Sequence, residues 1–131
     1  MAYVLDAHAL MVYLEKESGY EKVQQVLTDA ALHDRKLLLS TVNWGEVYYV
    51  TLRHYGSERT DQVARLVETF PIEIIDVDIA IAKQAALFKV AHRLSYADCF
   101  AAALAKARKA ILMTGDKEFR SLDGEIKIAW L

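Results

Sequence analysis

The chain of 131 residues has the size of one ordinary domain, and 54% of its residues are apolar, which is enough to build a buried core. Charged residues of both signs and a single proline exclude a disordered or low-complexity chain. One cysteine excludes an internal disulfide framework, and a formal net charge of −2 argues mildly against a nucleic-acid partner. We expect one domain over residues 1–131.

The sequence gives no sign of a membrane segment. No apolar stretch is long enough to span a bilayer. The first residues do not form a signal peptide, because Asp6 interrupts the apolar run and no small-residue cleavage site follows. We therefore expect a cytoplasmic protein with no membrane partner.

The first half of the chain alternates short strands with helices. Residues 3–5 and 37–40 are apolar runs that predict strands, and each leads directly into a helical pattern. These two helices are expected over residues 7–14 and from residue 41 to Tyr55, where Gly56 should stop the second one. A further helix reaching about His33 lies between them.

The second half continues the alternation. A helix beginning at Ser57 or Thr60 should end before Pro71, because the residue before proline disfavours helical backbone. Asp78 and Ser95 are placed to cap two further helices. The remaining expected elements are strands at 72–77 and 110–114, a helical turn at 117–122 and a weak strand at 126–130.

Strands that alternate with helices along the whole chain predict an α/β fold, with a parallel sheet of about five strands flanked by helices. In a parallel sheet all strands point the same way, so the segments that follow them gather at one edge. Open α/β sheets bind their ligands at that edge. We expect four acids, Asp6, Glu46, Asp98 and Asp116, to converge there.

Each of these acids also has a simpler interpretation as a helix cap. Ser95-x-x-Asp98 has the spacing of a capping box, and Asn43-x-x-Glu46 can be interpreted in the same way. Asp6 and Asp116 could each cap the turn that follows, because a negative charge is favourable near a helix N-terminus. Taken singly, capping is the default interpretation of any one of them.

Taken together, the four acids favour a metal site. Carboxylates focused on one edge repel one another and raise each other's pKa unless a cation is present. A carboxylate cluster without cysteine or neighbouring histidine selects hard ions such as Mg²⁺ and Mn²⁺, which predicts a metal-dependent hydrolase. Setting these four acids aside leaves 14 acidic against 16 basic residues, so the charge argument against nucleic acid weakens.

Four segments carry a resemblance to a known family. The sequence runs YVLDAHAL, STVNWGEVYYV, LSYADCFAAALA and ILMTGDKEF, spread over nearly the whole chain, resemble the PIN domain ribonucleases and in particular the VapC-type toxins of toxin–antitoxin pairs. The resemblance implies a single PIN-like nuclease domain. It also implies a Mg²⁺- or Mn²⁺-dependent endoribonuclease that acts as the toxin of a type II toxin–antitoxin system.

By position, Asp6, Glu46, Asp98 and Asp116 match the acidic quartet of that family, and Thr114 matches its supporting hydroxyl residue. The resemblance implies that Asp6, Asp98 and Asp116 hold the metal, with Glu46 completing its shell or orienting a water. It also implies an RNA substrate, a cognate antitoxin and a homodimer. The family commonly has Ser or Thr directly after the first acid, whereas this chain has Ala7 and then His8.

Lys117 and Arg120 flank the last acid and are candidates for contacts with RNA phosphates. The four histidines, at positions 8, 33, 54 and 92, lack metal-ligand spacing and are expected at the surface or at helix ends.

Three other functions compete with this one. A non-catalytic α/β interaction module would use the acids as caps alone. A receiver-like phosphoacceptor domain would need paired acids near the first strand and a Lys after the last. A haloacid-dehalogenase-type phosphatase would need a second Asp where His8 stands.

Overall fold

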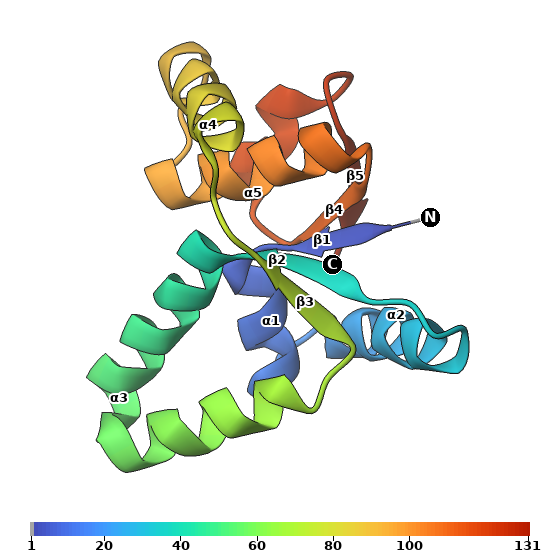
Figure 1. The fold of residues 1–131 in the computed structure, drawn as a ribbon, viewed down its shortest axis with the longest axis vertical. Helices are drawn as coiled ribbons and strands as arrows, with labels where there is room; N and C mark the ends of the chain where they lie inside the picture. The colour runs from blue at the N-terminus through green and yellow to red at the C-terminus, as the bar shows by residue number, and fades with distance from the viewer. Residues whose placement is uncertain (1) are drawn as a thin grey trace.

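A computed structural model describes residues 2–131 and contains one five-stranded sheet (Figure 1). Every neighbouring pair of strands is parallel, in the order β3-β2-β1-β4-β5. The strands are β1 (Tyr3–Leu5), β2 (Leu37–Ser40), β3 (Ile72–Ile75), β4 (Ile111–Thr114) and β5 (Lys127–Trp130). The predicted α/β class and parallel sheet are confirmed, and β3 is two residues shorter than expected.

Helices cover both faces of this sheet. They are α1 (Ala7–Leu14), α2 (Tyr20–Leu32), α3 (Thr41–Glu68), α4 (Ile79–Ala91), α5 (Tyr96–Arg108) and the short 3₁₀ helix η1 (Lys117–Leu122). No helix within residues 2–131 has both the length and the apolar character needed to cross a membrane.

Gly56 does not end a helix, as the sequence predicts, but kinks one. Its φ of 83° and ψ of 176° are non-helical, and helical turns continue on both sides, so the two expected helices form the single element α3. A positive φ favours glycine, which has no Cβ to clash. The Thr60 hydroxyl donates to the Gly56 carbonyl at 2.8 Å and so satisfies an acceptor at the kink.

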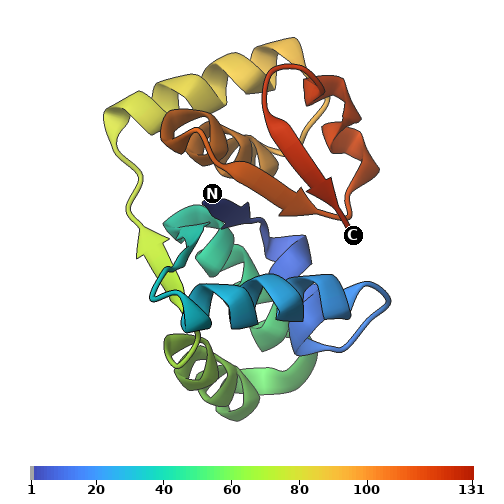
Figure 2. The same cartoon turned by 90° about the vertical axis from the view of Figure 1, so that its right-hand side faces the viewer.

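The strands have two buried faces because their side chains point alternately to opposite sides. Val4 of β1 and Leu112 of β4 face α4 and α5, whereas Leu5 and Met113, one residue further along, face α1, α2 and α3. The two helical layers lie on opposite sides of the sheet in Figure 1 and again in the turned view of Figure 2.

Small residues let α5 approach the sheet closely. Its run from Ala101 to Ala105 is fully or almost fully buried. Because α5 leads through a short turn into β4, it runs back across the sheet, and its N-terminus lies at the edge where the strands end. This brings the first turn of α5, with Asp98, to the edge that the sequence predicts as the ligand site.

Candidate active site

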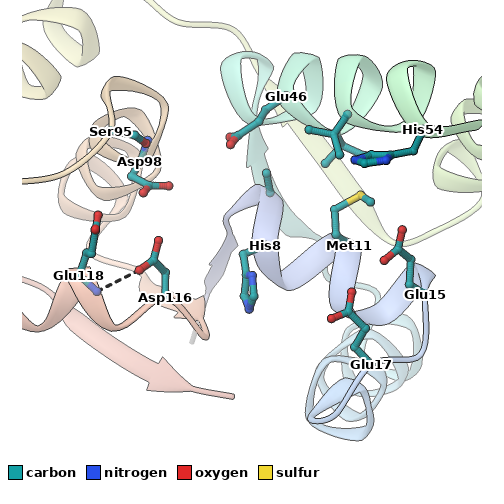
Figure 3. A pocket seen from close by; sticks show the side chains of 13 residues that line it. His8, Met11, Glu15, Glu17, Glu46, His54, Ser95, Asp98, Asp116 and Glu118 are labelled. Carbon is teal, nitrogen blue, oxygen red and sulfur yellow. Dashed lines mark hydrogen bonds between the residues drawn. The ribbon is translucent and has the colours of Figure 1, made fainter.

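A cleft of about 510 Å³ opens along the edge where the strands end (Figure 3). Three of the predicted acids line it: Glu46 from α3, Asp98 from α5 and Asp116 from the turn after β4. Asp6 follows β1 directly but does not line the cleft, and its side chain is 0% exposed. The structure is therefore consistent with the prediction that the acids gather at one edge of the sheet. Asp6 differs from the other three acids because it is buried in the protein interior.

Asp6 is the N-cap of α1, as the simpler interpretation predicts. Its Oδ1 accepts a hydrogen bond from the Ala9 backbone N–H at 2.7 Å. Its Oδ2 accepts one from the hydroxyl of Thr114, and that hydroxyl oxygen in turn accepts from the Asp116 N–H at 3.0 Å. One threonine thus connects the first and the last of the four acids.

Burial makes the ionised form of the Asp6 carboxylate unfavourable. Loss of hydration raises its pKa from 3.8 to about 7, although the hydrogen bonds from Thr114 and Ala9 act in the opposite direction. The charges of Asp98 and Glu46 raise it further. A cap needs no such burial, so the position of Asp6 calls for a cation nearby if the carboxylate is to be ionised at neutral pH.

The pKa values of Asp98 and Glu46 are also raised. Burial raises the pKa of Asp98 to about 6, with smaller contributions from the neighbouring charges of Asp116 and Glu46, and the Ser95 hydroxyl opposes the shift. Burial also raises the pKa of Glu46, against a hydrogen bond from Asn43. Perturbed carboxyl groups that share a cleft are typical of functional sites.

Ser95 is an N-cap, as the capping-box spacing predicts, whereas Asn43 is not. Ser95 caps α5 by accepting from the Asp98 N–H at 3.2 Å. The helix that carries Glu46 begins at Thr41, and its cap is Ser40, which accepts from the Val42 N–H at 3.2 Å. Strand β2 ends at Ser40, so the first available hydroxyl caps the helix and Asn43 falls inside it.

A carboxylate that the sequence analysis did not single out joins the cluster. Asp98, Asp116 and Glu118 each offer an oxygen, and these atoms lie within 4.8 Å of one another. Asp116 caps η1 by accepting from the Glu118 N–H at 2.9 Å, and this turn brings Glu118 beside it (Figure 3). Three oxygen donors suit Mg²⁺ or Mn²⁺. The pattern Asp-x-Glu at a turn was the available signal.

The cleft continues away from this cluster toward a second group of polar side chains. Glu15, Glu17 and His54 lie at its far end, and His8 lies between the two groups (Figure 3). Hydrogen bonding with Glu17 raises the pKa of Glu15. Lys117 and Arg120 are exposed and do not line the cleft, so their contact with phosphate stays a prediction.

The sequence matches the PIN domain family over residues 3–125. The chain belongs to the PIN domain family. No protein of curated function matches it by sequence.

Solved structures of toxin–antitoxin systems share the fold. VapBC2 from Rickettsia felis, bound to a promoter DNA fragment, superposes with a TM-score of 0.79 at 17% identity, covering 100% of this chain and 99% of that one. A toxin–antitoxin complex from Klebsiella pneumoniae gives 0.68 at 20% identity, covering 97% and 95%. VapC20 from Mycobacterium tuberculosis, a sarcin–ricin loop cleaving toxin, gives 0.68 at 14% identity, covering 93% and 95%.

Proposed function

We propose that this PIN domain is a Mg²⁺- or Mn²⁺-dependent endoribonuclease and the VapC-type toxin of a type II toxin–antitoxin system. The observation that carries the proposal is the burial of Asp6 behind an edge where Asp98, Asp116 and Glu118 bring carboxylate oxygens within 4.8 Å. Family membership and the fold shared with VapBC structures support the same activity.

In the proposed reaction, Asp98 and Asp116 hold the metal together with Glu118. The buried Asp6 contacts this group through the Thr114 hydroxyl, which bonds to both Asp6 and Asp116. When bound, the ion lowers the pKa of a water and offsets charge on the scissile phosphate during in-line attack. Glu46 faces the cluster from α3 and orients that water or completes the metal shell. The two hydrogen bonds of Thr114 fix the position of Asp6 relative to Asp116.

The rival functions fit less well. A receiver domain has the strand order 2-1-3-4-5, whereas this sheet has β1 between β2 and β4 and β3 at an edge. A non-catalytic module with acids as caps accounts for the hydrogen bonds of Asp6 and Asp116. It does not account for the burial of Asp6 or for the closeness of three carboxylates.

The matched pair Asp6 and Asp78 separates capping from catalysis. Asp78 caps α4 as Asp6 caps α1, accepting at 2.8 Å from the N–H three residues on, but it is exposed and lies outside the cleft. Purified wild type, Asp6→Asn and Asp78→Asn are incubated with total cellular RNA and Mn²⁺, with a chelator control. Asparagine also caps helices, so both variants should fold.

We expect discrete RNA fragments from wild type and Asp78→Asn, and no fragments from Asp6→Asn or in chelator. The fragments would also identify the RNA. Failure of the wild type to cleave RNA or to bind Mn²⁺ by calorimetry would return the acids to the role of helix caps.

Two protein partners complete the proposal, a cognate antitoxin and a second copy of the chain. The apolar helix faces at residues 23–30 and 63–70 are largely used in the core, since Val23, Leu27 and Val67 are buried. Exposed apolar side chains lie instead at Tyr49, Leu52, Tyr55 and Leu66 of α3 and at Ile79, Leu87 and Val90 of α4. Co-expression with the adjacent gene followed by light scattering tests both partners.

A further inference from the structure

Asn43 is a fully buried polar residue near the cleft, as Asp6 and Thr114 are. It lies in the first turn of α3, one helical turn before Glu46, and is 0% exposed. Its Nδ2 donates to Glu46 Oε1 at 3.4 Å and to the backbone carbonyl of Ala97 at 3.1 Å. Ala97 immediately precedes Asp98 in α5, so a single amide group connects the segments that carry two of the acids.

The other half of the same side chain is unpaired. Within residues 2–131, the Asn43 Oδ1 is buried without a hydrogen-bond partner. A buried unpaired acceptor is unfavourable for folding, whereas an apolar residue of the same size would carry no such cost. The interior of the helix also has no need of a cap at Asn43, because Ser40 supplies it.

We propose that Asn43 is a positioning residue that fixes the Glu46 carboxylate relative to Asp98. Both hydrogens of its amide are used, one on the side chain of Glu46 and one on the backbone of α5, so movement of either segment breaks a bond. Glu46 has several rotatable bonds and faces an open cleft, and without this donor its carboxylate would sample several positions. The inference rests on the proposed function, because it assigns Glu46 to the reacting site.

A double-mutant cycle tests the proposal. Asn43→Leu keeps the number and branching of the side-chain heavy atoms and removes both bonds, and it is made in the wild type and in Glu46→Gln. Thr60→Val is the matched control, since Thr60 is equally buried in α3 but bonds only to Gly56, away from the cleft. Cleavage of the RNA identified for the wild type is measured as kcat and KM, and stability as the unfolding temperature.

We expect Asn43→Leu to lower kcat by about tenfold to 100-fold, the range for residues that orient a metal site, with a much smaller change in KM. Its unfolding temperature should stay close to that of the wild type, because removal of an unpaired buried carbonyl offsets the cost of fitting a larger side chain. In Glu46→Gln the same substitution should have no further effect, and Thr60→Val should leave kcat unchanged. An equal loss of kcat with and without Glu46 would overturn the proposal.

Two additional measurements keep the proposal testable on its own. If Asn43→Leu does not fold, Asn43→Ser replaces it, because a hydroxyl has one hydrogen and cannot donate to both acceptors. If the wild type cleaves no RNA, the position of the Glu46 carboxylate is compared between crystal structures of the wild type and the variant. A Glu46 carboxylate that stays in place in the variant would overturn the proposal. A displaced carboxylate would support the positioning role of Asn43, even though the proposed nuclease function had failed.

Discussion

The hydroxyl of Thr114 donates a hydrogen bond to the carboxylate of Asp6, joining residues separated by 108 positions in the chain. The hydroxyl has one hydrogen, which this bond uses, so its oxygen is left to accept from the Asp116 N–H. The orientation of one small side chain therefore depends on two of the four acids at once.

Thr114→Val should remove the donor while keeping the shape of the side chain. Because the Thr114 hydrogen bond lowers the pKa of Asp6, its loss should raise that pKa further and move the pH profile of cleavage to higher pH. We expect a loss of stability of about 1–3 kcal/mol, typical of a buried polar group left without its partner. Thr114→Ser retains the hydroxyl and should restore both the profile and the stability.

The stability of the metal-free protein should fall as pH rises. The folded state raises the pKa of Asp6 from 3.8 to about 7, so between these values the folded chain holds a proton that the unfolded chain has lost. Unfolding becomes easier through this window, by at most about 4 kcal/mol. We would measure unfolding in chelator from pH 4.5 to 7.5 for wild type and Asp6→Asn, and the difference isolates Asp6 together with its interaction with Asp98 and Glu46.

Mn²⁺ should reverse that trend. Ions bind the ionised carboxylates, so stabilisation by Mn²⁺ should grow from pH 5 to pH 7.5 as protons leave the cluster. Differential scanning fluorimetry at fixed Mn²⁺ concentration checks this. Stabilisation independent of pH would mean that the ion binds elsewhere.

Glu118→Gln should weaken Mn²⁺ binding because it removes one of three oxygen donors that lie within 4.8 Å of one another. A loss of about tenfold to 100-fold in affinity is expected on calorimetry, comparable to the loss of other residues around metal sites. Glu58→Gln, an exposed acid in α3 outside the cleft, is the control. Equal affinities for the two variants would remove Glu118 from the site.

Gly115 determines where the His8 ring can lie. A Cβ at position 115 would stand 2.7 Å from His8 Nε2, so Gly115→Ala must shift the His8 ring, which lines the cleft together with Asp116. We expect cleavage to fall by the same factor in Gly115→Ala, His8→Ala and the double variant, with little change in stability, because the ring end is free to rotate. Additive losses in the double variant would show that Gly115 acts on the site by another route.

Local patterns in the sequence were sufficient to place most elements. Apolar runs that stop at Asp6 or Ser40 mark strand ends, and Ser95 and Asp78 cap the helices they precede, because these signals act within a few residues. Gly56 predicts the end of a helix, and this prediction is wrong, because helical turns resume directly after the kink, where Thr60 satisfies the Gly56 carbonyl.

The candidate site was only partly predictable. Asp98 and Asp116 were placed together because parallel strands and the helix before β4 end at one edge. Glu118 was missed because its approach to Asp98 depends on the turn of η1, and Asn43 was misjudged because its bonds to Glu46 and Ala97 depend on how α3 packs against α5. Such contacts arise from tertiary packing and leave no periodic trace in the sequence.

The central position of β1 in the sheet also affects the order of events during synthesis. β1 is made first but pairs with β4, which is made more than a hundred residues later. A ribosome-bound chain that lacks the last strands leaves one side of β1 unpaired and Asp6 without Thr114 or Asp116. A nascent chain therefore has no assembled carboxylate cluster, and any nuclease activity begins only when translation of the domain is nearly finished.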